Sequence, residues 1–218
     1  MKLIQEQVKR LLDRNALVLA GFALLGIIMS STVDASAHSE VGLLVTLMKQ
    51  EELLILFIVI VTELAKSSVI QDKQSKRMEF LLANGVRPRQ LIGQYTSSLY
   101  LTTLVLLLPA LMVYVISAFF QQEKGLLAWL GVTLFIVGLL DTLLVVYYIL
   151  YTVNLNKLNG IQMKAILFSI LLMMISFALY QYYPMIECYL GIKLVILTLA
   201  ILIISRLTTT ERIVRSYY

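Results

Sequence analysis

The sequence has little cysteine, histidine and proline, and few charged residues. Among its 218 residues it has one cysteine, Cys188, one histidine, His38, and three prolines, and charged residues make up 14%. A single cysteine cannot form an intrachain disulfide, and one cysteine with one histidine cannot supply the ligands of a Cys/His metal site. These shortages exclude a disulfide-stabilised fold and a Cys/His zinc centre, and a single histidine argues against haem handling.

Apolar residues dominate what is present. They make up 60% of the chain, and the mean hydropathy is +0.87. Repeated apolar runs of about 18 residues or more are typical of an integral membrane protein. Since each helical span needs about 20 residues, a chain of this length holds about six spans and no folded soluble domain. The predicted fold class is all-α, a polytopic membrane protein with a single transmembrane domain over residues 1–218.

Apolar runs and helical periodicity divide the chain into segments. An interfacial amphipathic helix is predicted at 1–15, and the spans are predicted at 16–33, 53–70, 91–119, 126–152, 165–183 and 191–205. The short apolar run 41–48 is cut off by the polar cluster 49–52, and we interpret it as an outer interfacial extension of the second helix. Pro109 interrupts the third span, which neighbouring helices accommodate in a membrane. A polar tail follows at 207–218.

The beginning of the sequence also resembles a secretory signal, because Ala35-Ser36-Ala37 follows a basic start and an apolar run. The leading segment is long and amphipathic, however, and contains Glu6 and Asp13. We therefore expect an interfacial helix there and no signal peptide.

The cationic residues are unevenly distributed between the two sides of this arrangement. If the N-terminus is cytoplasmic, three of the eighteen Lys and Arg lie outside, namely Lys49, Lys124 and Lys193, and the other fifteen (18 − 3) lie inside. Because cytoplasmic loops retain cations, this predicts a cell-membrane protein with both termini in the cytoplasm. An outer belt of interfacial tyrosines is predicted at Tyr180, Tyr182, Tyr183 and Tyr189.

The cytoplasmic loop 71–90, between the second and third spans, has a pattern of its own. Met78, Leu81 and Leu82 recur at helical spacing, which predicts a short amphipathic helix at 75–83. Asn84-Gly85 ends this helix, and Pro88 suits the start of the next one. The pattern alone leaves two interpretations open. The loop is either a basic segment that lies on anionic headgroups or a helix that docks its apolar face onto a partner protein.

The stretch DKQSKRMEFLLANGVRPRQLIGQ resembles the cytoplasmic loop of the type-2 (ABC-2 type) permeases of ATP-binding-cassette (ABC) exporters. That loop reads G-T-x-E-x-L-L, followed by a proline-containing turn and a basic residue. Glu79, Leu81 and Leu82 match, whereas Lys76-Arg77 replaces the usual Gly-Thr. In the family this loop carries the coupling helix that contacts the ATPase. The resemblance therefore implies that the ATPase-contacting residues are Lys76, Arg77, Met78, Glu79, Leu81, Leu82 and Gly85.

The sequence has no G-x-x-x-x-G-K-[ST] phosphate loop, so we do not expect this chain to be an ATPase. The resemblance implies a separate ATPase subunit that binds ATP and Mg, with no cofactor in this chain. It also implies a second permease subunit, in a homodimer or a heterodimer. The expected function is export of a peptide or an amphipathic, lipid-like substrate, such as antimicrobial-peptide export or immunity.

Asp141 is the one acid deep within a predicted span. It lies either on a substrate-lining or inter-subunit surface, or inside the bundle as a protonated or hydrogen-bonded carboxyl beside Thr142. Glu63 and Lys66, one helical turn apart, are predicted to pair. Two alternatives to an ABC permease are a secondary transporter, for which several midplane charges are expected, and a non-transporting membrane scaffold.

Overall fold

The computed structural model describes residues 14–31, 40–120, 130–183 and 185–214, with side chains for 15–30, 47–120, 130–183 and 185–214. Within these ranges the chain forms helices and no β-strand, so the all-α prediction is confirmed. The predicted interfacial helix at 1–15 lies outside the described residues except at its last two positions, which already belong to the first described helix.

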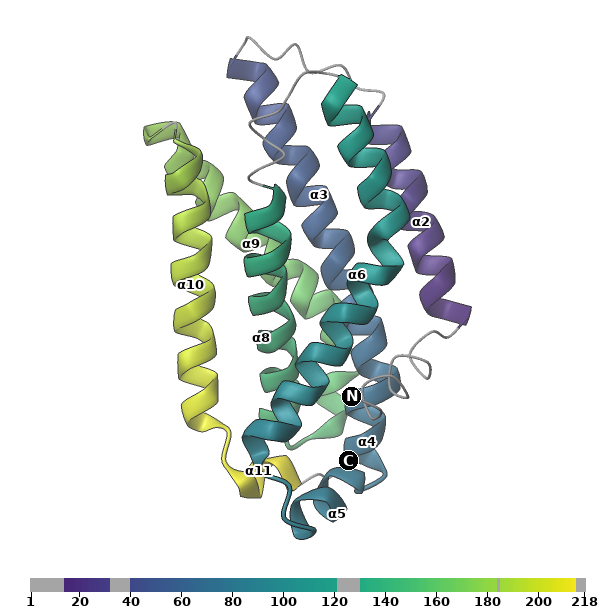
Figure 1. Cartoon of the computed structure of the whole chain (residues 1–218). Helices are drawn as coiled ribbons and strands as arrows, with labels where there is room; N and C mark the ends of the chain where they lie inside the picture. Colours follow the sequence, from purple (N-terminus) through teal and green to yellow (C-terminus); the bar gives the residue numbers. More distant parts are fainter. Residues whose placement is uncertain (1–13, 32–39, 121–129, 184, 215–218) are drawn as a thin grey trace.

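The long helices run up and down the molecule, side by side (Figure 1). They are α2 (Arg14–Ser31), α3 (Glu40–Ala65), α6 (Pro88–Phe120), α8 (Gly138–Tyr151), α9 (Ile161–Tyr182) and α10 (Ile186–Leu207). The shorter elements are the π-helices η1 (Lys66–Ile70) and η2 (Thr133–Val137), the 3-10 helix η3 (Leu155–Leu158), and α4 (Gln71–Gln74), α5 (Arg77–Ala83) and α11 (Thr210–Val214). We call the end of the bundle that carries α4, α5 and α11, at the bottom of Figure 1, the junction end.

Among the described residues, five helical segments are long and apolar enough to cross a membrane: Leu47–Gln74, Pro88–Phe120, Leu130–Tyr151, Ile161–Tyr182 and Ile186–Leu207. Their outward faces carry large exposed apolar side chains, including Met112, Phe119, Met174 and Leu202. Such surfaces are solvated by lipid, whereas in water they would promote association. The chain is therefore a multi-pass membrane protein.

The predicted first span, 16–33, corresponds to α2, which is shorter than the other long apolar segments. Its apolar part, Asn15–Ser30, covers about 24 Å at 1.5 Å per residue, against a hydrocarbon core of about 30 Å. The helix packs along α6 and α3 and contributes Ala23 and Ile27 to the main core.

The first part of α3 agrees with the prediction in part. Residues 41–48 were expected to extend the second helix, and α3 does run unbroken from Glu40 through the polar cluster 49–52. The cluster was expected to cut this extension off from the apolar span, but Lys49, Gln50 and Glu51 are all buried. Hydropathy along one segment cannot show that another helix supplies polar partners inside the bundle.

The centre of the bundle is the contact between α3 and α8. Phe57 on α3 is fully buried, and its ring lies 5.9 Å from that of Tyr100 between ring centroids. Gly138, the first residue of α8, faces it so closely that an added Cβ would lie 3.3 Å from two ring carbons of Phe57. The absence of a side chain at Gly138 thus allows close approach of the two helices.

This contact predicts opposite effects of the same substitution at two helical glycines. Gly93→Ala on α6 meets nothing within 4 Å and should raise stability by about 0.5–1 kcal/mol through helix propensity. Gly138→Ala should give no such gain, because the methyl group must displace the Phe57 ring. Thermal unfolding in detergent measures both. Equal stabilisation by the two substitutions would contradict the close packing.

Candidate functional site

The loop between α3 and α6 folds into the short helix α5, which begins two residues later than the predicted 75–83. The helix ends where the sequence indicated, at Asn84-Gly85. Gly85 has φ +85°, and its N–H donates to Leu82 O over 3.1 Å, while the Val86 N–H donates to Leu81 O over 3.1 Å. This pair of bonds is a Schellman motif, in which a left-handed residue satisfies the last carbonyls of a helix.

The turn into α5 contains a second left-handed residue. Lys76 has φ +58° and ψ +15°, and it is the only non-glycine residue with positive φ in the described ranges. The left-handed conformation is unfavourable for a residue with a Cβ and natural for glycine. Lys76 therefore occupies a position that the backbone would give to glycine.

The apolar stripe of α5 faces the bundle and not the surroundings. Met78 is 1% exposed, and Leu81 and Leu82 are half-buried against the same core, which also includes Ile213 of α11. The large apolar residue of α5 that points outward is Phe80, which is 68% exposed. Met78 is therefore covered by the chain's own core and is not free to dock, whereas Leu81 and Leu82 stay partly exposed, and the contact of this helix with an ATPase stays a prediction.

The other predicted contact residues of this loop also lie outward. Arg77, Glu79 and Gly85 are exposed, as is Lys76. Sequence reasoning missed Phe80 because it lies off the i, i+3, i+4 stripe, although an aromatic residue inside a charged loop was a visible signal.

A buried lysine joins this loop to α8. Lys73 Nζ donates to three backbone carbonyls, those of Ile149 at 3.0 Å, Leu150 at 2.8 Å and Thr152 at 2.7 Å. The last carbonyls of a helix have no partner within the helix and carry its partial negative charge. The Lys73 ammonium, with the residue 2% exposed, therefore caps the end of α8 and holds α4 against it.

Asp72, the neighbour of Lys73, joins the same loop to α6. Tyr95 on α6 donates its hydroxyl proton to Asp72 Oδ2 over 2.7 Å, and Arg77 Nη1 lies 3.5 Å from Asp72 Oδ1. The segment before α5 is thus fixed to α6 through Asp72 and to α8 through Lys73.

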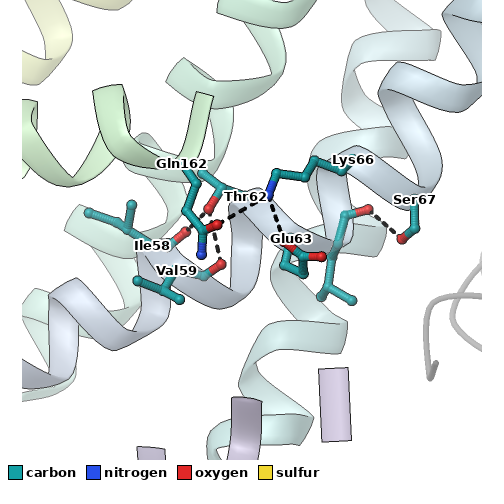
Figure 2. A network of polar contacts seen from close by, with 8 residues as sticks. Ile58, Val59, Thr62, Glu63, Lys66, Ser67 and Gln162 are labelled. Atoms are coloured by element: carbon teal, nitrogen blue, oxygen red, sulfur yellow. Dashed lines mark hydrogen bonds and ion pairs between the residues drawn. The ribbon is translucent and has the colours of Figure 1, made fainter. Parts of the chain in front are cut away.

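A third polar link, drawn in Figure 2, ties the end of α3 to α9. Lys66 Nζ contacts Glu63 Oε2 at 2.8 Å and Gln162 Oε1 at 3.1 Å. The predicted Glu63–Lys66 pair is confirmed, and Gln162 is an additional partner from a distant part of the sequence.

Asp141 lies in the middle of the bundle on α8, 7% exposed, beside a cavity of about 220 Å³. The charged groups that act on its carboxyl are Lys193 and Glu51. The hydroxyl of Thr142 donates to Gly138 O at 2.8 Å, so it bonds the backbone of its own helix. The structure thus places Asp141 on a cavity wall and in a buried charge cluster.

The core of that cluster is a buried ion pair between α3 and α10. Lys193 Nζ and Tyr189 Oη both donate to Glu51 Oε1, and the Lys193 ammonium lies 4.8 Å from the centroid of the Tyr189 ring. All three residues are at most 3% exposed. Within the described part of the chain, the second oxygen of Glu51, Oε2, has no hydrogen-bond partner.

The sequence analysis missed this cluster and misplaced two of its members. Lys193 was counted among the outer cations and Tyr189 among the interfacial tyrosines, yet both are buried. Tyr182 and Tyr183 are exposed, unlike Tyr189. The available signal was the i, i+4 spacing of Tyr189 and Lys193 on an otherwise apolar helix.

Helix α8 connects the two polar regions. Asp141 precedes the carbonyls that Lys73 holds, from Ile149 to Thr152, by 8 to 11 residues, which is about 12–16 Å along a helix. A displacement of the loop would therefore act on the same helix that carries Asp141.

Comparison with known proteins gives no match to a family model, a curated protein or a solved structure.

We expect Lys73→Met to destabilise the protein, because three carbonyls lose a charged donor inside the bundle. Each hydrogen bond to a charged group contributes about 1.5–3 kcal/mol, and the burial cost of the ammonium group offsets part of the three bonds, so the net loss should be at least about 3 kcal/mol. The measurement is thermal unfolding in detergent. Arg89→Met, at an exposed position on α6, is the control and should change stability by less than about 0.5 kcal/mol. A Lys73→Met protein as stable as the control would contradict the capping role.

Removal of one partner of the buried Glu51–Lys193 pair should lower the stability of the protein more than removal of both partners. Lys193→Met leaves Glu51 without its cation and should destabilise by about 3–5 kcal/mol, whereas the double variant Glu51→Leu/Lys193→Met should recover most of the loss. Lys66→Met breaks the partly exposed pair with Glu63 and should cost less than about 1 kcal/mol. If the double variant unfolds as early as Lys193→Met, the coupling is absent.

Proposed function

We propose that this chain is the membrane-spanning permease subunit of an ABC exporter, with its junction end in the cytoplasm. The observation that carries the proposal is α5, a short helix that presents Phe80 and Glu79 outward while its stem is fixed to two membrane helices. A helix with an exposed aromatic residue and a rigid base is suited to receive a force from a docked partner.

The loop's resemblance to type-2 permeases gains support from Lys76. The family carries glycine at the position of Lys76, and this is where the backbone is left-handed. At the residue where this chain departs from the family pattern, its backbone therefore has the conformation for which glycine is best suited.

The distribution of cations supports an orientation of the chain in the membrane. Those at the junction end include Lys76, Arg77, Arg87, Arg89 and Lys157, all exposed. At the opposite end the described cations Lys49 and Lys193 are buried within the bundle. This asymmetry supports a cytoplasmic junction end and, with α2 as a short first span, six spans with both termini inside.

In this function, a separate ATPase subunit binds ATP and Mg and docks on α5. Its movement reaches α8 through Lys73 and α6 through Asp72, and α8 carries it to Asp141 at the cavity. Two permease subunits, identical or different, enclose the path. The substrate class we propose is a peptide or an amphipathic, lipid-like molecule.

A second candidate, an ion-gradient-driven transporter, is favoured by the buried cluster. Glu51, Asp141 and Lys193 give the bundle three buried ionisable groups where the sequence indicated one. Intramembrane carboxylates of this kind occur in proton relays. In this function, transport would depend on Asp141 and not on α5.

Purification of the full chain from its native membrane separates the two. We expect a chain with a phosphate loop to co-purify and to hydrolyse ATP. Phe80→Ser and Glu79→Arg should each lower the bound ATPase at least tenfold, without loss of expression, because both side chains are exposed. Met78→Ala is the matched control. Because Met78 is buried, this substitution should lower the stability of the protein but have a smaller effect on the amount of bound ATPase.

A stable complex without a nucleotide-binding chain would contradict the first function. Uptake or export driven by a pH gradient in reconstituted vesicles without ATP, and abolished by Asp141→Asn, would establish the second.

A further inference from the structure

Two cavities lie one above the other along α8. The first, of about 220 Å³, has a mainly apolar wall that includes Leu144, Ala165 and Ala200, with Asp141 and Lys164 also on its lining. The second, of about 670 Å³, lies at the junction end and is more polar. Its lining is Tyr148, Tyr151, Thr152, Val153, Asn154, Lys157, Thr209, Glu211 and Arg212. Tyr148 belongs to both.

The two cavities share one face of α8. Asp141, Leu144 and Tyr148 line the apolar cavity, and Tyr148, Tyr151 and Thr152 line the polar one. Steps of three and four residues keep these side chains on a single helix face. From Asp141 to Tyr148 is about 10 Å along the helix, and from Asp141 to Thr152 about 16 Å. The two cavities therefore adjoin at Tyr148 along this face, the one towards the middle of the bundle apolar and the one at its end polar, and together we call them the groove.

Cationic side chains lie at the boundary between the two cavities and around the polar one. Lys164 Nζ lies 3.4 Å from Tyr148 Oη and donates to Lys157 O at 2.7 Å. The Arg212 guanidinium lies 4.5 Å from the centroid of the Tyr151 ring. Lys157 is exposed at the edge of the polar cavity.

Glu211 is the one carboxylate on the lining of the polar cavity, against Lys157 and Arg212, with Lys164 at the boundary. The excess of positive charge favours an anion there. Tyrosines beside lysine and arginine at the end of an apolar helix are characteristic of the membrane interface. The polar cavity thus lies at the depth of lipid headgroups, and the apolar cavity at the depth of lipid chains.

We propose that this groove binds one anionic phospholipid. Its phosphate is held by Lys157, Arg212 and Lys164, and one acyl chain enters the apolar cavity towards Asp141. A soluble phosphate compound would use the cations but not the apolar cavity, and a neutral lipid would use the cavity but not the cations. The site does not depend on the proposed exporter function, because it requires only that the chain spans a membrane.

Binding can be measured on the full chain, purified in mild detergent, by native mass spectrometry. Phosphatidylglycerol and phosphatidylcholine of the same chain length are added at equal concentration. We expect one tightly held phosphatidylglycerol per chain, preferred at least tenfold over phosphatidylcholine. Lys157→Gln combined with Arg212→Gln should reduce this preference at least fivefold. Arg87→Gln combined with Arg89→Gln removes two exposed cations at the same end, outside both cavities, and should leave it unchanged.

The chain-binding half of the site has its own test. Ala200→Phe fills the apolar cavity and should lower phosphatidylglycerol binding at least fivefold. Leu199→Phe, on the neighbouring exposed position of α10, should leave binding as it is. Both variants are first checked for an unchanged unfolding temperature. If Ala200→Phe unfolds early, Ala165→Phe on α9 replaces it.

Glycerol phosphate and inorganic phosphate distinguish a lipid site from a soluble-anion site. Neither should compete with phosphatidylglycerol at millimolar concentration. Competition by either, or full binding by Ala200→Phe and Ala165→Phe proteins of normal stability, would overturn the proposal in favour of a soluble anion. Equal retention of the two lipids would overturn it as well.

Discussion

The proposed transmission of force from α5 to α8 depends on the hydrogen bonds that the Lys73 ammonium group donates to the end of α8. The last carbonyls of α8 have no hydrogen-bond donor within the helix. The Lys73 ammonium donates to three carbonyls there at once. A cation at a helix C-terminus is also favoured by the helix dipole. With the adjacent Asp72 bonded to Tyr95, two neighbouring residues fix one loop to two membrane helices.

The buried charges in the half of the bundle away from the junction end obey a different balance. Burial removes the hydration of Glu51 and Lys193. Their mutual ion pair and the hydrogen bond from Tyr189 to Glu51 offset part of the free energy that this costs. Such a pair adds little net stability compared with apolar packing, but either charge left alone inside the bundle is costly. With Asp141, the cluster holds two carboxylates and one ammonium, and this gives the interior a polarity that packing of α3, α8 and α10 does not require.

The sequence predicted well what depends on one segment at a time. The all-α membrane class and the end of α5 at Asn84-Gly85 follow from local patterns, and the structure has both. It failed where the environment of a residue is set by a distant helix. Lys193 and Tyr189 looked interfacial because their partner, Glu51, is over a hundred residues away. Met78 looked like a docking residue because periodicity shows which side chains share a face, but not what that face meets.

The most direct test of the account is the distance between α5 and the end of α8. With Cys188 replaced by Ser, spin labels are placed at Ala83→Cys on α5 and Asn156→Cys in η3, both exposed positions. The distance distribution is measured by pulsed electron paramagnetic resonance with Lys73 intact and with Lys73→Met. We predict a narrow distribution that broadens when Lys73 is replaced. A distribution that is already broad with Lys73 present, or that is unchanged by its replacement, would show that Lys73 does not hold the loop on α8.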